Sequence, residues 1–468
     1  MKISWSFLKP LVLYYSVFTL LYLLRYSLPQ TVVLCLLALI GAFYLFRIFK
    51  KIPTVSQKIL SFGGIFCFTS VIFHLVSFTF FLFFGNSFDV WPHKIEVDNA
   101  FEYIFEAEFY FITCATLMIS GWLLFSGHLS ANFALLDLRM VKKSVYKIVL
   151  FFLGFMNFVF PLFFANYYST VGLIGPIINY SYVIIVCLFL FASNSKNTFL
   201  NNIFYPILLC LPLITTSIKS GMKEVIMFGL IPLFIGIWLL LKTKIQKLIF
   251  GFLLFIFFSF VSLYVTATRM IDRETKSNVN ITEIQQNLSA LVSEPDIILD
   301  IVSKVLSRKN MMDMNARAFY FIDQGLVYQE YGFIYGIPVL IPRLFWRSKP
   351  KIIPGNEFAR LTANDNVLYS DTPGFFTAIY LSSGFAIGLI SSFLFGCFIA
   401  GLQNAAKLYY TSLGKALFSL NLCYMGLRLD EYFPVEVFPK IISIFLVCGI
   451  IGFLLEHFSN AIMVRKPI

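Results

Sequence analysis

The sequence predicts an all-α polytopic membrane protein with about 12 transmembrane helices and one large extracytoplasmic loop. The first observation is composition: the 468 residues are 59% hydrophobic and 13% charged, whereas a soluble protein carries about 25% charged residues. The second is a mean hydropathy of +0.82, which comes from long apolar runs. The third is a single stretch of mixed polarity that interrupts these runs. Together they exclude a soluble globular, a disordered and a fibrous protein.

The apolar runs define the spans, because a helix needs about 20 mostly apolar residues to cross a bilayer. No small-residue cleavage site follows the first run, so we interpret it as a retained span and not as a signal peptide. We predict twelve spans, at residues 8–24, 30–46, 60–84, 101–125, 148–167, 172–193, 198–217, 223–241, 248–268, 376–400, 410–427 and 440–456.

Basic residues predict the orientation. With the N-terminus in the cytoplasm, the cytoplasmic side holds 18 Lys and Arg residues, and the short outer loops hold six. Cytoplasmic loops of membrane proteins are typically the more basic ones, so we expect both termini inside and the large loop outside. Much of the net charge of +12 then faces anionic lipid, which favours membrane lipids over nucleic acid as its partner.

The large loop covers residues 269–375 and follows nine spans (1–268), with three more spans after it (376–468). It carries 12 basic and 12 acidic residues. Helical spacing predicts short helices at 281–291 and 298–306, before an irregular segment rich in Gly, Pro and aromatic residues. A loop of this length is usually functional. The chain has no G-x-x-x-x-G-K-[ST] motif, so we do not expect an ATP-driven pump.

Neither a metal nor a cofactor is predicted. The eight Cys lie in or beside apolar runs without a C-x-x-C pair, and the four His are scattered along the chain, so neither set has the spacing of metal ligands. His74 lies in the middle of the third span. We interpret it as a hydrogen-bonded packing residue rather than a proton relay.

The densest basic cluster outside the cytoplasm lies in the second part of the loop. Its members are Arg343, Arg347, Lys349 and Lys351, with Trp346 among them. Arg binds phosphate through its planar fork and Lys adds a point charge. An aromatic residue here suits a sugar face or the membrane interface. The cluster therefore indicates a site for the pyrophosphate of a lipid carrier, the alternative being a loop that only touches lipid headgroups.

Four further basic residues are candidates for the same site. Arg269 follows the ninth span, Arg317 lies within the loop, and Lys219 and Lys223 lie at the outer turn between spans seven and eight. Free backbone N–H groups at the start of the eighth helix favour an anion near Lys223. Snorkelling to the interface is the alternative for the two lysines.

Carboxylates at the outer face are candidates for a general base. Asp371 lies just before the tenth span, Glu330 lies within the loop, and Glu431 follows Asp430 in the last outer loop. The sequence does not choose among them. Three more carboxylates begin the fourth span, where pairing with the basic loop is expected. They are Glu102, Glu106 and Glu108.

The second part of the loop carries a recognisable run of residues. It contains Tyr331-Gly332, Tyr335-Gly336 and then Ile341-Pro342-Arg343-Leu344-Phe345-Trp346-Arg347-Ser348-Lys349-Pro350. This stretch resembles the Wzy-type polysaccharide repeat-unit polymerases, which show an I-P-R-x-x-W-P-x-K-P run after a Tyr/Gly-rich approach. Arg347 stands where that family commonly has Pro.

Three other segments resemble the family more loosely. Arg317 matches an upstream Arg. The outer turn Ser220-Gly221-Met222-Lys223 matches a G-S-R-like turn, with Lys in place of Arg. The segment Tyr380-Leu381-Ser382-Ser383-Gly384 resembles the Y-x-N-x-G entry to the next span, with Ser382 in place of Asn.

The resemblance implies a metal-independent glycosyltransferase of the bacterial cytoplasmic membrane that needs no cofactor. Its donor and acceptor would be undecaprenyl-pyrophosphate-linked oligosaccharides, joined into O-antigen or capsular or exopolysaccharide chains. A Wzz-type chain-length regulator is a candidate partner. Arg343 is expected to bind the pyrophosphate, and Trp346, Tyr331 and Tyr335 are candidates for stacking on sugars. Because the leaving group is already a pyrophosphate, basic side chains and one carboxylate suffice for this chemistry.

Two alternatives remain open. An O-antigen ligase shares the layout of many spans and one large outer loop, and would move the glycan onto lipid A-core. A transporter, such as a lipid-linked oligosaccharide flippase, should carry charges near the middle of several spans and have spans interrupted by Gly or Pro. The predicted charges gather at the outer surface, which favours the enzyme.

Overall fold

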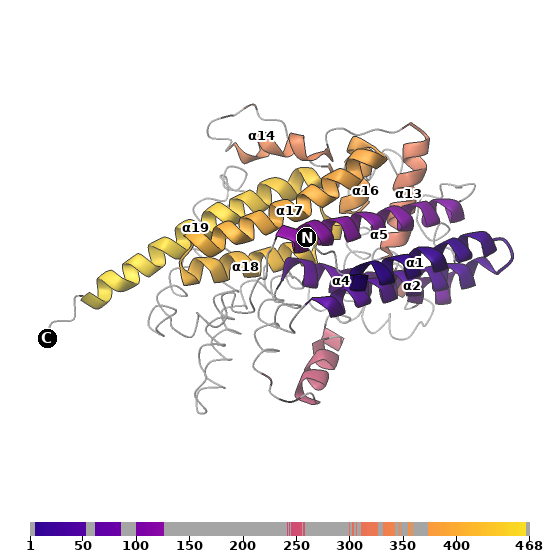
Figure 1. Ribbon diagram of the computed structural model, residues 1–468, viewed down its shortest axis with the longest axis horizontal. Coiled ribbons are helices and arrows are strands. Elements are labelled where there is room, and N and C mark those ends of the chain that lie inside the picture. Colours follow the sequence, from indigo (N-terminus) through magenta and orange to yellow (C-terminus); the bar gives the residue numbers. More distant parts are fainter. Residues whose placement is uncertain are drawn as a thin grey trace, which may run out of the picture. The chain divides into compact units, whose positions relative to one another are not determined.

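The computed structural model in Figure 1 is helical throughout the part of the chain that it describes, and no strand occurs there. The described residues are 5–52, 61–85, 100–125, 241, 243, 245–254, 256–257, 299, 302–303, 306, 310–325, 331–341, 346, 348, 354–355, 357–358 and 373–464. The all-α class predicted from the sequence is thereby confirmed for these residues.

Five of the described helices are long and apolar enough to cross a membrane. They are α2 (Gln30–Lys51), α4 (Phe62–Phe84), α5 (Ala100–Phe125), α17 (Phe385–Tyr409) and α19 (Pro434–Val464). The helices α1 (Trp5–Leu24) and α18 (Ser412–Leu427) coincide with two more predicted spans. The protein is thus a membrane protein with transmembrane helices.

Apart from residue 241, four predicted spans lie outside the described residues, and the span predicted at 248–268 lies only partly within them. The four are 148–167, 172–193, 198–217 and 223–241. The count of twelve spans, the location of both termini and the side on which the loop lies therefore stay predictions.

The chain forms two compact units. The first contains Met1–Phe133, Leu306–Tyr410 and Leu422–Leu446, and the second contains Ala134–Val305, Thr411–Asn421 and Val447–Ile468. In the second unit the Nδ2 of Asn421 lies 3.6 Å from the Sγ of Cys448, which joins α18 to α19. The paired, buried ionisable residues described below belong to the first unit.

In the first unit, α1, α2, α4 and α5 pack together through apolar faces and a few polar contacts between helices. Tyr15 shares a hydrogen bond of 2.7 Å with Thr113, and Tyr44 shares one of 2.9 Å with Thr116. These bonds tie α1 and α2 to α5. Hydrogen bonds of this kind fix helix orientation where lipid offers no hydrophobic driving force between helices.

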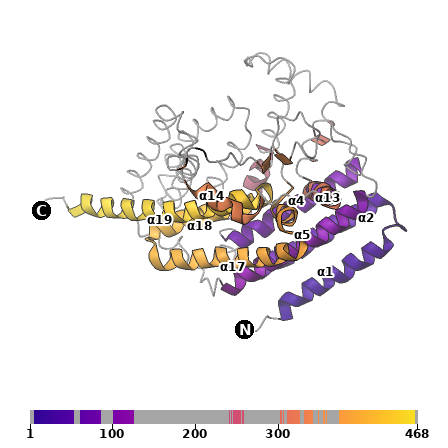
Figure 2. The same cartoon turned by 90° about the horizontal axis from the view of Figure 1, so that it is seen from above.

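The helices α5 and α17 lie side by side (Figure 2), and small residues of α17 form the contact between them. Every fourth residue of α17 from Gly388 to Ala400 is small and buried. At Gly396 an added Cβ would lie 1.9 Å from the carbonyl oxygen of Met118, so the two backbones touch. Close approach at small residues is typical of helix pairs in membranes. Gly388 lies against Tyr110 and Gly396 lies against Met118, so residue numbers rise in the same direction along both helices. The two helices therefore run parallel, and in the predicted topology both begin outside.

The bounds of the span predicted at 376–400 are wrong, because the chain forms two helices there and only the second, Phe385–Tyr409, is long enough to cross a membrane. The short helix α16 (Phe375–Ser383) ends at Gly384, and α17 begins directly after it. Gly384 has φ 77° and Gly374, which precedes α16, has φ 88°. Only glycine adopts such a conformation without strain, and an apolar run does not reveal it.

Part of the predicted outer loop is folded against the spans. The helix α13 (Met311–Asp323) packs against α5, α16 and α4, and the short helices η5 (Phe333–Gly336) and α14 (Ile337–Leu340) follow it. Of the helix predicted at 298–306, the described residues are helical, whereas the helix predicted at 281–291 lies outside the described residues.

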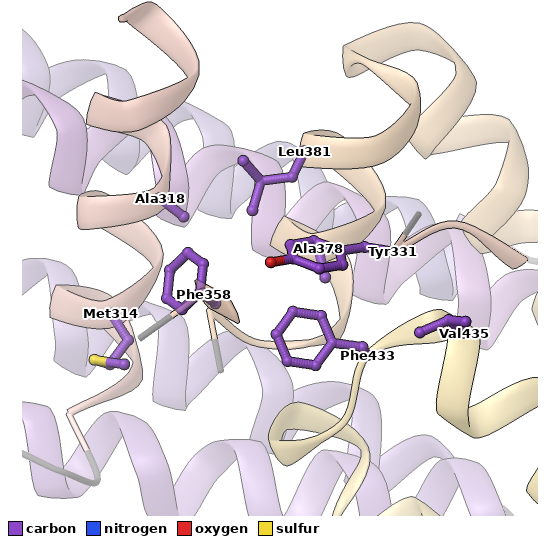
Figure 3. Close-up of a cluster of buried hydrophobic side chains, with 8 residues drawn as sticks. All are labelled: Met314, Ala318, Tyr331, Phe358, Ala378, Leu381, Phe433 and Val435. Carbon is purple, nitrogen blue, oxygen red and sulfur yellow. The ribbon is translucent and has the colours of Figure 1, made fainter. Parts of the chain in front are cut away.

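A buried hydrophobic cluster holds these pieces together (Figure 3). The ring of Phe433, next to the start of α19, lies 4.7 Å from the ring of Tyr331 and 6.4 Å from that of Phe358. The cluster joins α13, α16 and the start of α19, so it anchors this part of the loop on the helix bundle. Its members are Met314, Ala318, Tyr331, Phe358, Ala378, Leu381, Phe433 and Val435.

Candidate functional site

Ionisable side chains gather in the core of the first unit, although burial of a charge is costly unless it is paired. They come from α4, α5, α13 and the turn η6 (Leu429–Glu431) between α18 and α19. The buried members are His74, Glu108, Asp313, Arg428 and Asp430. Three of the five are carboxylic acids, so the local balance of charge depends on their partners.

The first group is a pair formed by His74 of α4 and Glu108 of α5. The imidazole Nε2 lies 3.0 Å from Oε1 of Glu108, and Nδ1 lies 2.6 Å from the backbone carbonyl oxygen of Ser70. Gly41 of α2 provides the space, because a Cβ there would lie 2.5 Å from atoms of both side chains. The pair is therefore enclosed by three helices.

Ser70 connects this pair to the turn η6. Its hydroxyl donates a hydrogen bond of 3.3 Å to Oδ2 of Asp430. The chain just before η6 lies directly against α4, since a Cβ at Gly426 would lie 2.9 Å from the carbonyl oxygen of Phe62. We call Glu108, His74, Ser70 and Asp430 the buried polar chain. It runs from α5 through α4 to the turn that joins α18 to α19.

The second group lies on α13 and α16. Arg317 Nη2 lies 3.4 Å from Oδ2 of Asp313, one helical turn earlier, and Thr377 donates a hydrogen bond of 2.8 Å to Oδ1 of Asn315. These four residues form the α13 polar group. It adjoins η6 at Gly374, where a Cβ would lie 2.9 Å from Oδ1 of Asn315 and 3.7 Å from the carbonyl oxygen of Asp430.

Two cations lie beside the same turn. The guanidinium of Arg428 donates a hydrogen bond of 3.2 Å to the Tyr424 hydroxyl and lies 4.7 Å from the ring centre of Tyr432. Lys440 Nζ lies 3.8 Å from the same ring. Cation–π contacts of this kind stabilise a charge that is partly removed from water. The turn therefore carries both signs of charge within a few residues.

The carboxylates at the start of α5 have partners other than the large loop. Glu102 pairs with Arg25 at 3.3 Å and accepts a hydrogen bond from the hydroxyl of Tyr26. This hydrogen bond raises the pKa of Tyr26, because the phenol loses its proton less readily beside a carboxylate. Glu108 pairs with His74 instead. The expectation that these two residues pair with the basic loop is wrong.

Of the predicted site residues, the structure places Arg317 in the α13 polar group and Glu431 in η6, next to Asp430. Trp346 donates a hydrogen bond of 3.1 Å to Ser348, and Tyr335 is 40% exposed. All the others except Tyr331 lie outside the described residues. They are Asp371, Glu330, Arg343, Arg347, Lys349, Arg269, Lys219 and Lys223.

Tyr331 occupies a different environment from the one expected of a sugar-stacking residue. It is fully buried and packs against Phe433 in the hydrophobic cluster (Figure 3). In this arrangement its ring offers no face to a sugar, and its contacts stabilise the loop. Stacking on sugars stays a prediction for Trp346 and Tyr335.

The sequence reasoning missed the buried polar chain. His74 and Glu108 are 34 residues apart, and nothing in the sequence shows that their helices are neighbours. The available signal was that each is an ionisable residue within a predicted span, and such residues usually have a partner. Asp313 carried a clearer signal, because it precedes Arg317 by one helical turn.

No protein-family model, no curated protein and no solved structure matches this chain. Within the described ranges, no three His, Cys, Asp or Glu side chains lie close enough to hold a metal ion. The fold and the site together describe a helical membrane protein that contains paired, buried ionisable residues.

Proposed function

We propose that the protein joins undecaprenyl-pyrophosphate-linked oligosaccharide repeat units into O-antigen or capsular or exopolysaccharide chains, at the outer face of the bacterial cytoplasmic membrane. The resemblance of residues 325–350 to the Wzy-type polymerases is the starting point. The structural observation in its support is the position of α13. It places Asn315, two residues before the predicted pyrophosphate ligand Arg317, beside Gly374, which also lies close to the turn that carries Asp430 and the candidate base Glu431.

This arrangement suits glycosyl transfer to a sugar hydroxyl. The acceptor oxygen forms a bond to the anomeric carbon of the donor while the bond from that carbon to the pyrophosphate oxygen breaks. The acceptor proton passes to a carboxylate, for which the outer-face acids are candidates. Negative charge develops on the leaving pyrophosphate, and preorganised cations stabilise it. Arginine is suited to this role because its planar fork binds two oxygens at once.

The contact between Arg317 and Asp313 supports a positioning role for the acid. Asp313 is fully buried and Arg317 is only 12% exposed on its side chain. An ion pair with a buried carboxylate on the same helix keeps the guanidinium close to that helix. Asp313 therefore orients Arg317 and does not itself need to touch the substrate.

The test is complementation of a host strain that lacks the gene. The wild-type protein should restore a ladder of long chains, and without it single repeat units should remain on the lipid carrier or core. Arg343→Ala should abolish the ladder and Arg343→Lys should remove most of it, because the point charge of Lys does not reproduce a bidentate fork. Loss of one phosphate contact costs about 2–4 kcal/mol by analogy with an oxyanion donor, which is roughly a hundred- to thousand-fold in rate.

Lys351→Ala is the matched control, since it lies in the same basic cluster but outside the family-like run. Chain length should be read at equal amounts of each variant in the membrane. A wild-type ladder from Arg343→Ala would overturn this assignment. Long chains that stay on the carrier in the deletion strain would indicate a ligase.

A transporter is the second candidate, and one observation favours it specifically. The helix pair α16–α17 is interrupted at Gly384, and the His74–Glu108 pair lies within the spans. Broken helices and buried ionisable residues are typical of transporters. In the deletion strain, repeat units confined to the cytoplasmic face would support a flippase and contradict a polymerase.

A further inference from the structure

We propose that His74 and Glu108 form a proton-binding site inside the helix bundle, and that Asp430 in the turn η6 is electrostatically coupled to it. The ligand of this site is a single proton. The inference is independent of the proposed function, because it depends only on the contacts of the buried polar chain.

The hydrogen bonds determine how many protons the pair holds. The carbonyl oxygen of Ser70 can only accept, so Nδ1 of His74, 2.6 Å away, carries a proton. The contact of 3.0 Å between Nε2 and Oε1 of Glu108 then needs one more proton. That proton lies either on His74, as an imidazolium beside a carboxylate, or on Glu108, as a carboxylic acid beside a neutral imidazole.

Both arrangements have zero net charge, which is why the pair is tolerated at this depth. The two side chains are 4% and 2% exposed. If the shared proton leaves, one negative charge remains, and if another proton binds, one positive charge results. An uncompensated charge in such a position is costly. Exchange of the proton must therefore be accompanied by a response from the groups that face the pair.

The groups that face the pair come from several elements. Tyr14 of α1 lies within electrostatic range of Glu108, and its hydroxyl makes no hydrogen bond with the residues that the structure describes. The hydroxyl of Tyr44 on α2 is held by Thr116 of α5. Asp430 of η6 acts on His74 through its charge. Tyr14 thus supplies a donor near Glu108, and the carboxyl group of Asp430 acts on the pair from the turn, which Arg428 also adjoins.

Ser70 joins the pair to the turn in a direct way. Its carbonyl oxygen accepts a hydrogen bond from His74, and its hydroxyl donates a hydrogen bond to Asp430. A single residue is thus hydrogen-bonded to both side chains. Loss of the shared proton would place a second negative charge near the carboxylate of Asp430. The turn η6, which also adjoins the α13 polar group at Gly374, would experience that repulsion.

The test uses infrared difference spectra of the purified full-length protein in lipid nanodiscs, recorded between acid and alkaline pH. The wild type should show a pH-dependent carboxyl band, that of a carboxylic acid if Glu108 holds the shared proton and that of a carboxylate if His74 holds it. Glu108→Gln should lose this band but keep its fold, because the Gln amide can donate to Nε2 and preserve the hydrogen bond. Glu102→Gln is the matched control: it removes a carboxylate that pairs with Arg25 near the start of the same helix and should leave the band unchanged.

Coupling to the turn is measured with Asp430→Asn, which retains an oxygen acceptor for Ser70 but removes the negative charge. A nearby negative charge favours the protonated state, so its removal should shift the midpoint of the band to lower pH. Thermal unfolding of each variant verifies that it is folded. The proposal is overturned if the wild type shows no such band, if Glu108→Gln retains it, or if Asp430→Asn leaves the midpoint unchanged.

Discussion

Single residues show how this chain accommodates charge in an apolar interior. His74 is hydrogen-bonded, as its predicted packing role requires, but its partners are Glu108 and the Ser70 carbonyl. A neutral shared-proton pair satisfies both side chains at once. Asp313 is fully buried on α13 and is paired with Arg317. In each case the ionisable group is tolerated because a partner comes from the same or a neighbouring helix.

The pair on α13 gives a prediction for stability. Arg317→Met removes a cationic partner of a buried carboxylate, and breaking such a pair costs about 3–5 kcal/mol. Adding Asp313→Asn should recover much of that loss, because the uncompensated charge is removed with its partner. The measurement is thermal unfolding in detergent. Arg47→Met, at an exposed site, is the control and should change stability by about 0.5 kcal/mol or less. A double variant no more stable than Arg317→Met would contradict the ion-pair interpretation.

The candidate site was only partly predictable at this scale. Arg317 was identified from its resemblance to a family position, and the structure places it beside Asp313 in the core. Tyr331 was expected to contact sugar, yet it is buried, because an aromatic residue in a Gly-rich loop has the same sequence signature in either role. The buried polar chain depends on which helices are neighbours, and a single sequence does not contain that information.

At the scale of helices, the α5–α17 contact gives a second prediction. Gly396→Ala should destabilise the fold by about 1–3 kcal/mol, as overpacking does, because its Cβ would meet the Met118 carbonyl oxygen at 1.9 Å. Gly401→Ala on the same helix has nothing within 4 Å and is the matched control. Equal unfolding temperatures for the two variants would contradict backbone contact at Gly396.

The positions of several long helices were predictable from the apolar runs, but the breaks between helices were not. The runs correctly indicate α2, α4 and α5, whose bounds agree with the predicted spans to within a few residues. The break at Gly384 was missed, since the run continues through it and the positive φ appears only in the structure. The helix α13 was also missed as a core element, because its mixed composition resembles that of a surface loop.

At the scale of the whole molecule, the orientation gives a third prediction. A reporter fused within residues 275–310 should be extracytoplasmic, and one fused within 243–246 should be cytoplasmic, because basic residues are concentrated in the loops predicted to face the cytoplasm. Accessibility of the two reporters in intact cells is the measurement. A large loop inside the cell would contradict both the predicted orientation and the proposed reaction, which takes place at the outer face of the membrane.

Chain extension by the purified protein tests the central claim most directly. The full-length protein is reconstituted in lipid vesicles with undecaprenyl-pyrophosphate-linked repeat units, without nucleotide and with a chelator present. The account predicts a ladder of longer lipid-linked chains and released undecaprenyl pyrophosphate, both lost in Arg343→Ala and retained in Lys351→Ala. Repeat units that cross the bilayer without being joined, or that remain unchanged in the presence of folded protein, would contradict it.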